Sequence, residues 1–127
     1  MLLVLPLYIA NRGVVRGQEQ AARSTAAAID DLDRAADVDP FATEPLIVKS
    51  ALLAGDGDAA GAQEAAAEAV DRAPNDWTAW TVLAEARLLA GDAPGARAAV
   101  ERVAELNPRA RQLQGLRETL AEPTAQP

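Results

Sequence analysis

The clearest pattern of apolar and polar positions lies near the C-terminus of the chain. Leucines recur there at helical spacing, and polar side chains fill the positions between them: Leu113, Leu116 and Leu120 against Arg111, Gln114, Arg117 and Glu118. This spacing predicts an amphipathic helix with one buried face and one solvated face. Such a helix is typical of the cap that solvates the end of a repeat array.

The chain begins with ten uncharged, mostly apolar residues, MLLVLPLYIA, and the first charged residue is Arg12. As a helix this run would be about 15 Å long, roughly half of a bilayer core about 30 Å thick. It lacks the positive start and the nearby cleavage site of a signal peptide. For residues 1–12 we therefore keep three alternatives: a cap on the first repeat, a helix in a membrane interface, or the last turns of a membrane-spanning helix. The segment makes either a membrane-associated or a cytoplasmic location consistent with the sequence.

An internal repeat with a step of 34 residues organises the rest of the chain. Four sets of equivalent positions, which we call columns, keep the same residue type at this step: Pro40, Pro74 and Pro108; Gly57 and Gly91; Asp58 and Asp92; Ala28, Ala62 and Ala96. The strings GDAAGA and GDAPGA carry three of these columns in each repeat. Periods of this length indicate a stack of supersecondary units that share one continuous core.

Each column has a physical role in a pair of antiparallel helices. Glycine is the residue that most easily ends a helix in the left-handed conformation, and the aspartate after it caps the next helix. Alanine allows two helices to approach closely where they cross, and proline ends the second helix of each pair. These signals predict helices over residues 13–38, 43–54, 59–73, 77–90, 93–106 and 109–121.

The repeat resembles the tetratricopeptide repeat, which has the same period and the pattern W-x2-L-G-x2-Y, A-x3-F, P. Residues 77–110 match it at Trp80, Leu83, Gly91, Ala96, Val100 and Pro108, and depart from it at Ala84 and Arg87. Residues 43–76 match more loosely, with Lys49 in an apolar column. The resemblance implies an all-α fold: a short helical solenoid over residues 13–121, with a long N-terminal helix, a C-terminal cap helix and a disordered tail at 122–127.

In tetratricopeptide proteins the first helix of each pair lines a concave groove. The resemblance therefore implies groove positions at Glu44, Ile47, Ala51, Thr78, Thr81, Glu85 and Leu88. The Lys, Asn and Arg residues with which one subset of the family grips a terminal carboxylate are absent from these positions. Trp77 and Trp80 share a helix face. Trp80 occupies the repeat's core column, so Trp77 is the tryptophan more available to a ligand.

Composition narrows the function further. The chain has a net charge of −7, which opposes general binding to nucleic acid, and it has no Cys and no His, which removes thiolate chemistry and the commonest base and metal ligand. Asp56 and Asp58 suggest a calcium loop, but the fifth and twelfth positions of such a loop are Ala60 and Ala67. No phosphate loop, nucleophile elbow or paired catalytic carboxylates are present. We therefore expect no catalytic residues, no cofactor and no metal.

A second resemblance concerns residues 34–45 (RAADVDPFATEP) and 69–80 (AVDRAPNDWTAW). These stretches are similar to the tail of O-antigen ligase or polymerase-type membrane proteins, in which a last membrane helix runs into alanine-rich repeats. Two functions follow from the two resemblances. The first is a non-catalytic protein–protein interaction scaffold with an unidentified protein or peptide partner. The alternative is an accessory C-terminal domain, or fragment, of a membrane-embedded glycan-assembly protein, with membrane contact through residues 1–10.

Overall fold

The structure is a computed structural model that describes residues 23–121. The chain divides into two units, Met1–Asp31 and Leu32–Pro127. Residues 23–31 of the first unit are helical, and the second unit begins with helical residues 32–38. The predictions for residues 1–12, for the start of the long helix at 13–22 and for the tail at 122–127 lie outside the described residues.

Five further helices follow in the second unit: α2 (Glu44–Gly55), α3 (Ala59–Arg72), α4 (Trp77–Leu89), α5 (Ala93–Leu106) and α6 (Arg111–Ala121). Their bounds agree with the predicted helices to within two residues. The largest difference is the start of α6, which begins at Arg111 instead of Arg109. The Asn107 side chain accepts a hydrogen bond from the Arg109 N–H (3.3 Å), and the Asn107 carbonyl accepts one from the Ala110 N–H (3.1 Å), so these residues form a turn.

The two predicted glycine–aspartate turns are confirmed. Gly57 and Gly91 have φ angles of 83° and 80°, and no other described residue has a positive φ. After Gly91, the Asp92 N–H donates to a carbonyl in the last turn of α4 (2.8 Å), and the Asp92 side chain accepts from the Gly95 N–H (2.9 Å). Asp58 makes the equivalent bonds one repeat earlier. Glycine therefore ends the first helix of each pair and aspartate begins the second.

Small side chains fill the contacts between helices. Ala62 and Ala96 are completely buried, which confirms their predicted place at the helix crossings, whereas Ala28 is half-buried. Two clusters of buried residues form the core, one shared by residues 32–38, α2, α3 and α4, and the other by α4, α5 and α6. Trp80 packs against both clusters. Because the fully buried core residues are alanine, valine and leucine, neighbouring helices pack closely.

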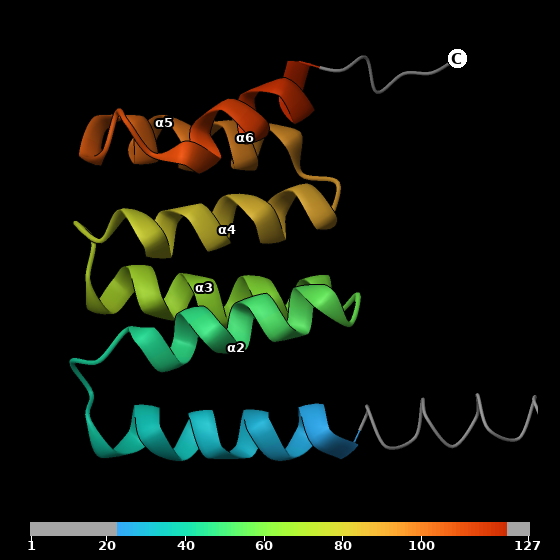
Figure 1. Cartoon of the computed structure of the whole chain (residues 1–127), viewed down its shortest axis with the longest axis vertical. Coiled ribbons are helices and arrows are strands. Elements are labelled where there is room, and N and C mark those ends of the chain that lie inside the picture. Colours follow the sequence, from blue (N-terminus) through green and yellow to red (C-terminus); the bar gives the residue numbers. More distant parts are fainter. Residues whose placement is uncertain (1–22, 122–127) are drawn as a thin grey trace, which may run out of the picture. The chain divides into compact units, whose positions relative to one another are not determined.

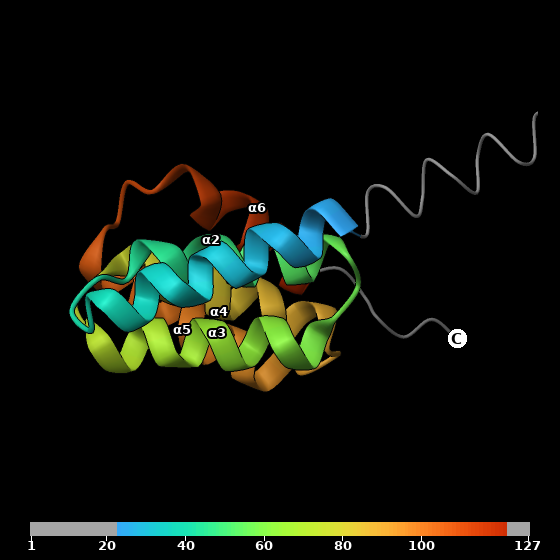
Figure 2. The same cartoon turned by 90° about the horizontal axis from the view of Figure 1, so that it is seen from below.

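The helices of the second unit stack in chain order, each against the next (Figure 1). In addition α2 contacts α4 and α4 contacts α6, whereas α3 and α5, both fully described, do not touch each other. The first helices of successive pairs therefore lie closer together than the second helices. Figure 2 shows α2 and α3 on opposite sides of this stack. The unit is thus an all-α solenoid whose inner face is formed by α2, α4 and α6.

Candidate protein-binding face

Residues on α2 and α4 form the candidate site, since these two helices lie side by side on the inner face. Glu44, Ala51 and Glu85 are exposed on it, and Ile47, Thr78 and Leu88 are half-buried. Ile47 packs against the first core cluster and Leu88 against the second, and each keeps part of its apolar surface in contact with solvent. We call the surface formed by these six residues the α2–α4 face.

One side-chain link fixes the starts of the two helices relative to each other. Thr43, the residue before α2, donates from its Oγ1 to the Asp76 carboxylate (3.1 Å). The same carboxylate accepts the Thr78 N–H (3.0 Å) and thereby caps α4. Thr43 forms no side-chain cap on its own helix. Asp76 therefore stabilises the first turn of α4 and also positions α2 beside it.

Thr81 differs from its expected role in the groove. It is 5% exposed, and its Oγ1 donates to the Trp77 carbonyl one turn earlier (2.9 Å). A hydroxyl that is bonded back to its own helix is not available to a ligand. Thr81 is therefore a buried residue of α4 and is not part of the α2–α4 face.

The two tryptophans are less different than their sequence positions suggest. Both are half-buried, so burial alone does not separate a core Trp80 from a freer Trp77. Trp80 packs between the two core clusters and donates from its Nε1 to the Pro74 carbonyl (2.7 Å). Trp77 packs against the second cluster. Both indoles therefore pack against the core, and both remain partly accessible.

The α2–α4 face is acidic and partly apolar. Glu44 and Glu85 are its only charged side chains, and it contains no Lys or Arg. Partial burial raises the pKa of the Glu85 carboxyl from its ordinary value of 4.5. A carboxylate that is partly withdrawn from water favours an approaching positive group.

Several supporting contacts were not anticipated from the sequence. Ser50, which is 1% exposed, donates from its Oγ to the Ala62 carbonyl (2.8 Å) and so joins α2 to α3. Lys49 pairs with Asp33 (2.6 Å), which explains a charged residue in an apolar column. Arg87 donates to the Gly95 carbonyl (3.0 Å) and joins α4 to α5. A polar or charged residue at a repeat position that is usually apolar could have drawn attention to such contacts, but the sequence does not identify the partners.

Within residues 23–121, no group of three or more acidic residues is placed to hold a metal ion. The same part of the chain contains no helix that is long and apolar enough to cross a membrane.

Comparisons with known proteins agree with this geometry. A family model described as "Tetratricopeptide repeat" matches residues 53–120, which is just over half of the chain. One similar solved structure is the first tetratricopeptide domain of Spaghetti (RPAP3) bound to the HSP90 peptide SRMEEVD, with 23% identity, a TM-score of 0.70 and coverage of 75% of this chain and 78% of that one. Another is the first such domain of human RPAP3 determined by NMR, with 23% identity, a TM-score of 0.68 and coverage of 76% and 80%.

No curated protein matches the chain. The two solved structures, at 23% identity, resemble the chain in fold. None of these comparisons supports the resemblance to the tails of O-antigen ligase-type proteins.

Proposed function

Because the chain belongs to the tetratricopeptide-repeat family, we propose that it is a non-catalytic scaffold that binds a protein segment on its α2–α4 face. The observation that carries this proposal is the placement of α2 beside α4, with accessible apolar and acidic side chains on both helices. Repeat solenoids present extended inner surfaces of this kind to their partners.

The charges on the face define the partner's chemistry. Glu44 and Glu85 are acidic, and Ile47 and Leu88 offer partly exposed apolar surface. A segment with apolar side chains and at least one Lys or Arg would complement both features. The similar RPAP3 domain is bound to a peptide that ends in EEVD. Because this chain has no cation on its α2–α4 face, we expect that acidic peptide to bind no more tightly than a scrambled version of it.

The experiment starts from a displayed library of random peptides selected on the full chain. The selected peptide is then titrated by calorimetry against the wild type and two matched variants. Ala51→Arg places a long cation on the α2–α4 face, whereas Ala98→Arg makes the same change at an exposed alanine of α5. We expect Ala51→Arg to weaken binding by about 1–3 kcal/mol and Ala98→Arg to leave it unchanged.

Two results would contradict the proposal. One is a selected peptide whose affinity depends on Ala98 and not on Ala51. The other is a selection that enriches acidic peptides, because these are opposed by the charges of Glu44 and Glu85.

A further inference from the structure

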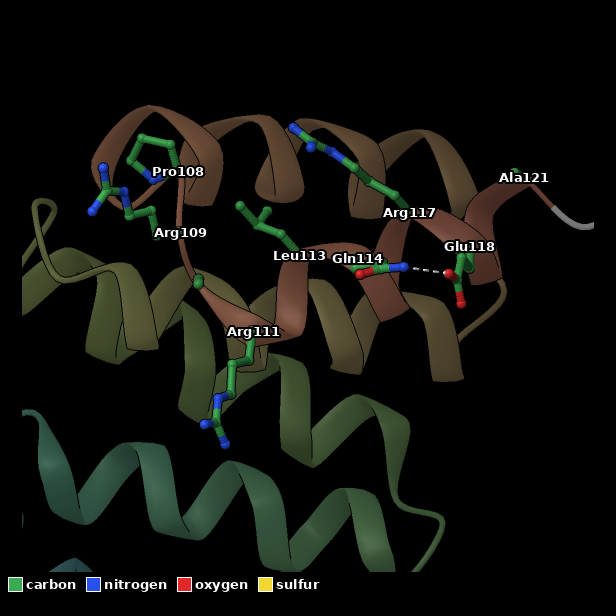
Figure 3. Close-up of a pocket in the computed structure, with 9 residues that line it drawn as sticks. Pro108, Arg109, Arg111, Leu113, Gln114, Arg117, Glu118 and Ala121 are labelled. Atoms are coloured by element: carbon green, nitrogen blue, oxygen red, sulfur yellow. Dashed lines mark hydrogen bonds between the residues drawn. The ribbon is translucent and has the colours of Figure 1, made fainter.

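The C-terminal end of the second unit carries a pocket lined by three arginines and by apolar side chains. The pocket has a volume of about 600 Å³ and is lined by the turn after α5 and by α6 (Figure 3). Arg109 and Arg117 lie on either side of Leu113, while Arg111 extends away from it. Leu113 is 3% exposed. We call this site the arginine pocket.

The positive charge of this region is not neutralised locally. Within the described residues 23–121, the guanidinium groups of Arg109 and Arg117 form no ion pair. Arg117 also lines an adjacent hollow of about 310 Å³ together with Arg97, Val100, Glu101 and Leu120. Together the two hollows are lined by four arginines and two acidic residues: Arg97, Arg109, Arg111 and Arg117, with Glu101 and Glu118. In a chain with a net charge of −7, this region is therefore locally basic.

A surface of the opposite character lies near the start of the same unit. Residues 37–41, which we call the acidic loop, have the sequence DVDPF. They comprise the last two residues of the first helical segment and the start of the turn that leads to α2. Its two apolar side chains are among the most exposed large hydrophobics of the described chain, with Val38 85% and Phe41 87% accessible. Asp37 and Asp39 lie on either side of Val38 in the sequence and are also exposed. The loop thus presents two apolar side chains next to two negative charges.

The shape of the acidic loop is fixed by the rest of the unit. The Arg72 guanidinium donates to the carbonyls of Ala36 (3.1 Å), Asp39 (3.2 Å) and Ala42 (3.0 Å). The Asp39 side chain accepts the Phe41 N–H (3.0 Å). A fixed backbone lowers the entropy lost when exposed side chains enter a binding site.

The repeat register shows that the fold does not require an aromatic residue at position 41. The corresponding residues one and two repeats later are Asn75 and Arg109, which are both polar and exposed. Phe41 buries almost none of its ring within the unit. An exposed aromatic side chain that folding does not use is typical of an interaction anchor.

We propose that the acidic loop of one copy of this chain docks in the arginine pocket of a second copy, so that chains associate head to tail. Phe41 and Val38 would lie against the exposed apolar lining of the pocket, which includes Pro108 and Ala121, and Asp37 and Asp39 would pair with Arg109 and Arg117. A second copy is the occupant that the charges favour, because each chain carries one surface of each sign. The two surfaces are different patches, so the contact is heterologous and continues from copy to copy into a ring or an open chain, instead of forming a symmetric dimer.

The test uses sedimentation velocity on the full chain and on neutralised variants. Arg109→Gln with Arg117→Gln removes two of the pocket's three positive charges. Asp37→Asn with Asp39→Asn removes the loop's charge while keeping the acceptor for the Phe41 N–H. We expect the sedimentation coefficient of the wild type to rise with protein concentration over a range up to about 300 µM. Each double variant should have a dissociation constant for self-association about tenfold higher or more.

Mixing the two double variants gives the sharpest readout. Each has one intact surface, so the mixture is expected to restore association only as a one-to-one dimer that does not extend. Phe41→Ser should also abolish association with little effect on folding. Arg23→Gln with Arg102→Gln makes the same charge change outside both hollows and should associate like the wild type.

Three results would overturn the proposal. The full chain could remain monomeric over the whole concentration range. It could associate equally in all variants, which would assign self-association to another surface. A labelled peptide of residues 36–42 could bind the pocket while the full chain stays monomeric, which would assign the pocket to a different acidic protein.

Discussion

Arg72 allows the energetic account of the fold to be tested with a matched pair of substitutions. Its Nη1 lies within 3.2 Å of three backbone carbonyls, and its side chain is 16% exposed. That nitrogen carries two hydrogens, so two of the three bonds are well formed at any moment. A hydrogen bond from a charged donor contributes about 1.5–3 kcal/mol, and carbonyls near the surface regain water when it is lost. We therefore expect Arg72→Met to destabilise the protein by about 2–4 kcal/mol.

Arg102 provides the control. Its side chain is 36% exposed, it pairs with Glu105 on the same helix (2.8 Å), and its contact with Asn75 is long, at 3.4 Å. Exposed pairs contribute about 0–1 kcal/mol, so Arg102→Met should cost less than about 1 kcal/mol. Urea unfolding followed by circular dichroism measures both free energies. Equal losses for the two variants would refute the role that we assign to the carbonyls beside Arg72.

Three further predictions use the same unfolding assay. Ala96→Leu should destabilise the protein by about 1–3 kcal/mol, because Ala96 is completely buried and a larger side chain would overpack the helix crossing. Ala98→Leu lies on an exposed site and should be nearly neutral, so similar unfolding midpoints for the two variants would contradict the repeat register. Gly91→Ala should destabilise the protein by about 1–2 kcal/mol, because Gly91 has a positive φ. Gly115→Ala, inside α6, should stabilise that helix by about 0.5–1 kcal/mol. If both variants changed the free energy of unfolding in the same direction, the result would be inconsistent with the turn at Gly91. Because the pKa of Glu85 is raised, the native state binds a proton more readily than the unfolded chain, so this group favours folding increasingly as pH falls toward 4.5. Glu85→Gln should therefore be more stable than the wild type at neutral pH, with a difference that disappears below pH 4.5; a constant difference would exclude this linkage.

The sequence was most informative where one residue type satisfies a local backbone requirement. Gly57 and Gly91 end helices in the left-handed conformation, and Asp58 and Asp92 cap the helices that follow. These are short-range effects, so spacing alone located them. The turn after α5 was placed less accurately, since the Asn107 side chain bonds the Arg109 N–H and delays the helix by two residues.

Contacts between repeats could not be predicted in the same way. Thr43 is a good helix cap by residue type, yet its hydroxyl bonds the Asp76 carboxylate 33 residues away. Thr81 occupies a groove position by register, yet its side chain turns back to the Trp77 carbonyl. The choice among these partners depends on how α2 and α4 approach each other, which is set by packing over the whole unit. The repeat register therefore indicated which positions are accessible on the face, with Thr81 as the exception, but not the bonds that hold α2 beside α4.

The central claim is that a partner segment lies on the α2–α4 face, and amide chemical-shift mapping tests it most directly. The isotope-labelled full chain would be titrated with the peptide selected from the library. The account predicts that perturbed amides cluster in α2 (Glu44–Gly55) and α4 (Trp77–Leu89), while α3 and α5 remain unchanged. Perturbations confined to α3 and α5, with α2 and α4 unaffected, would contradict it.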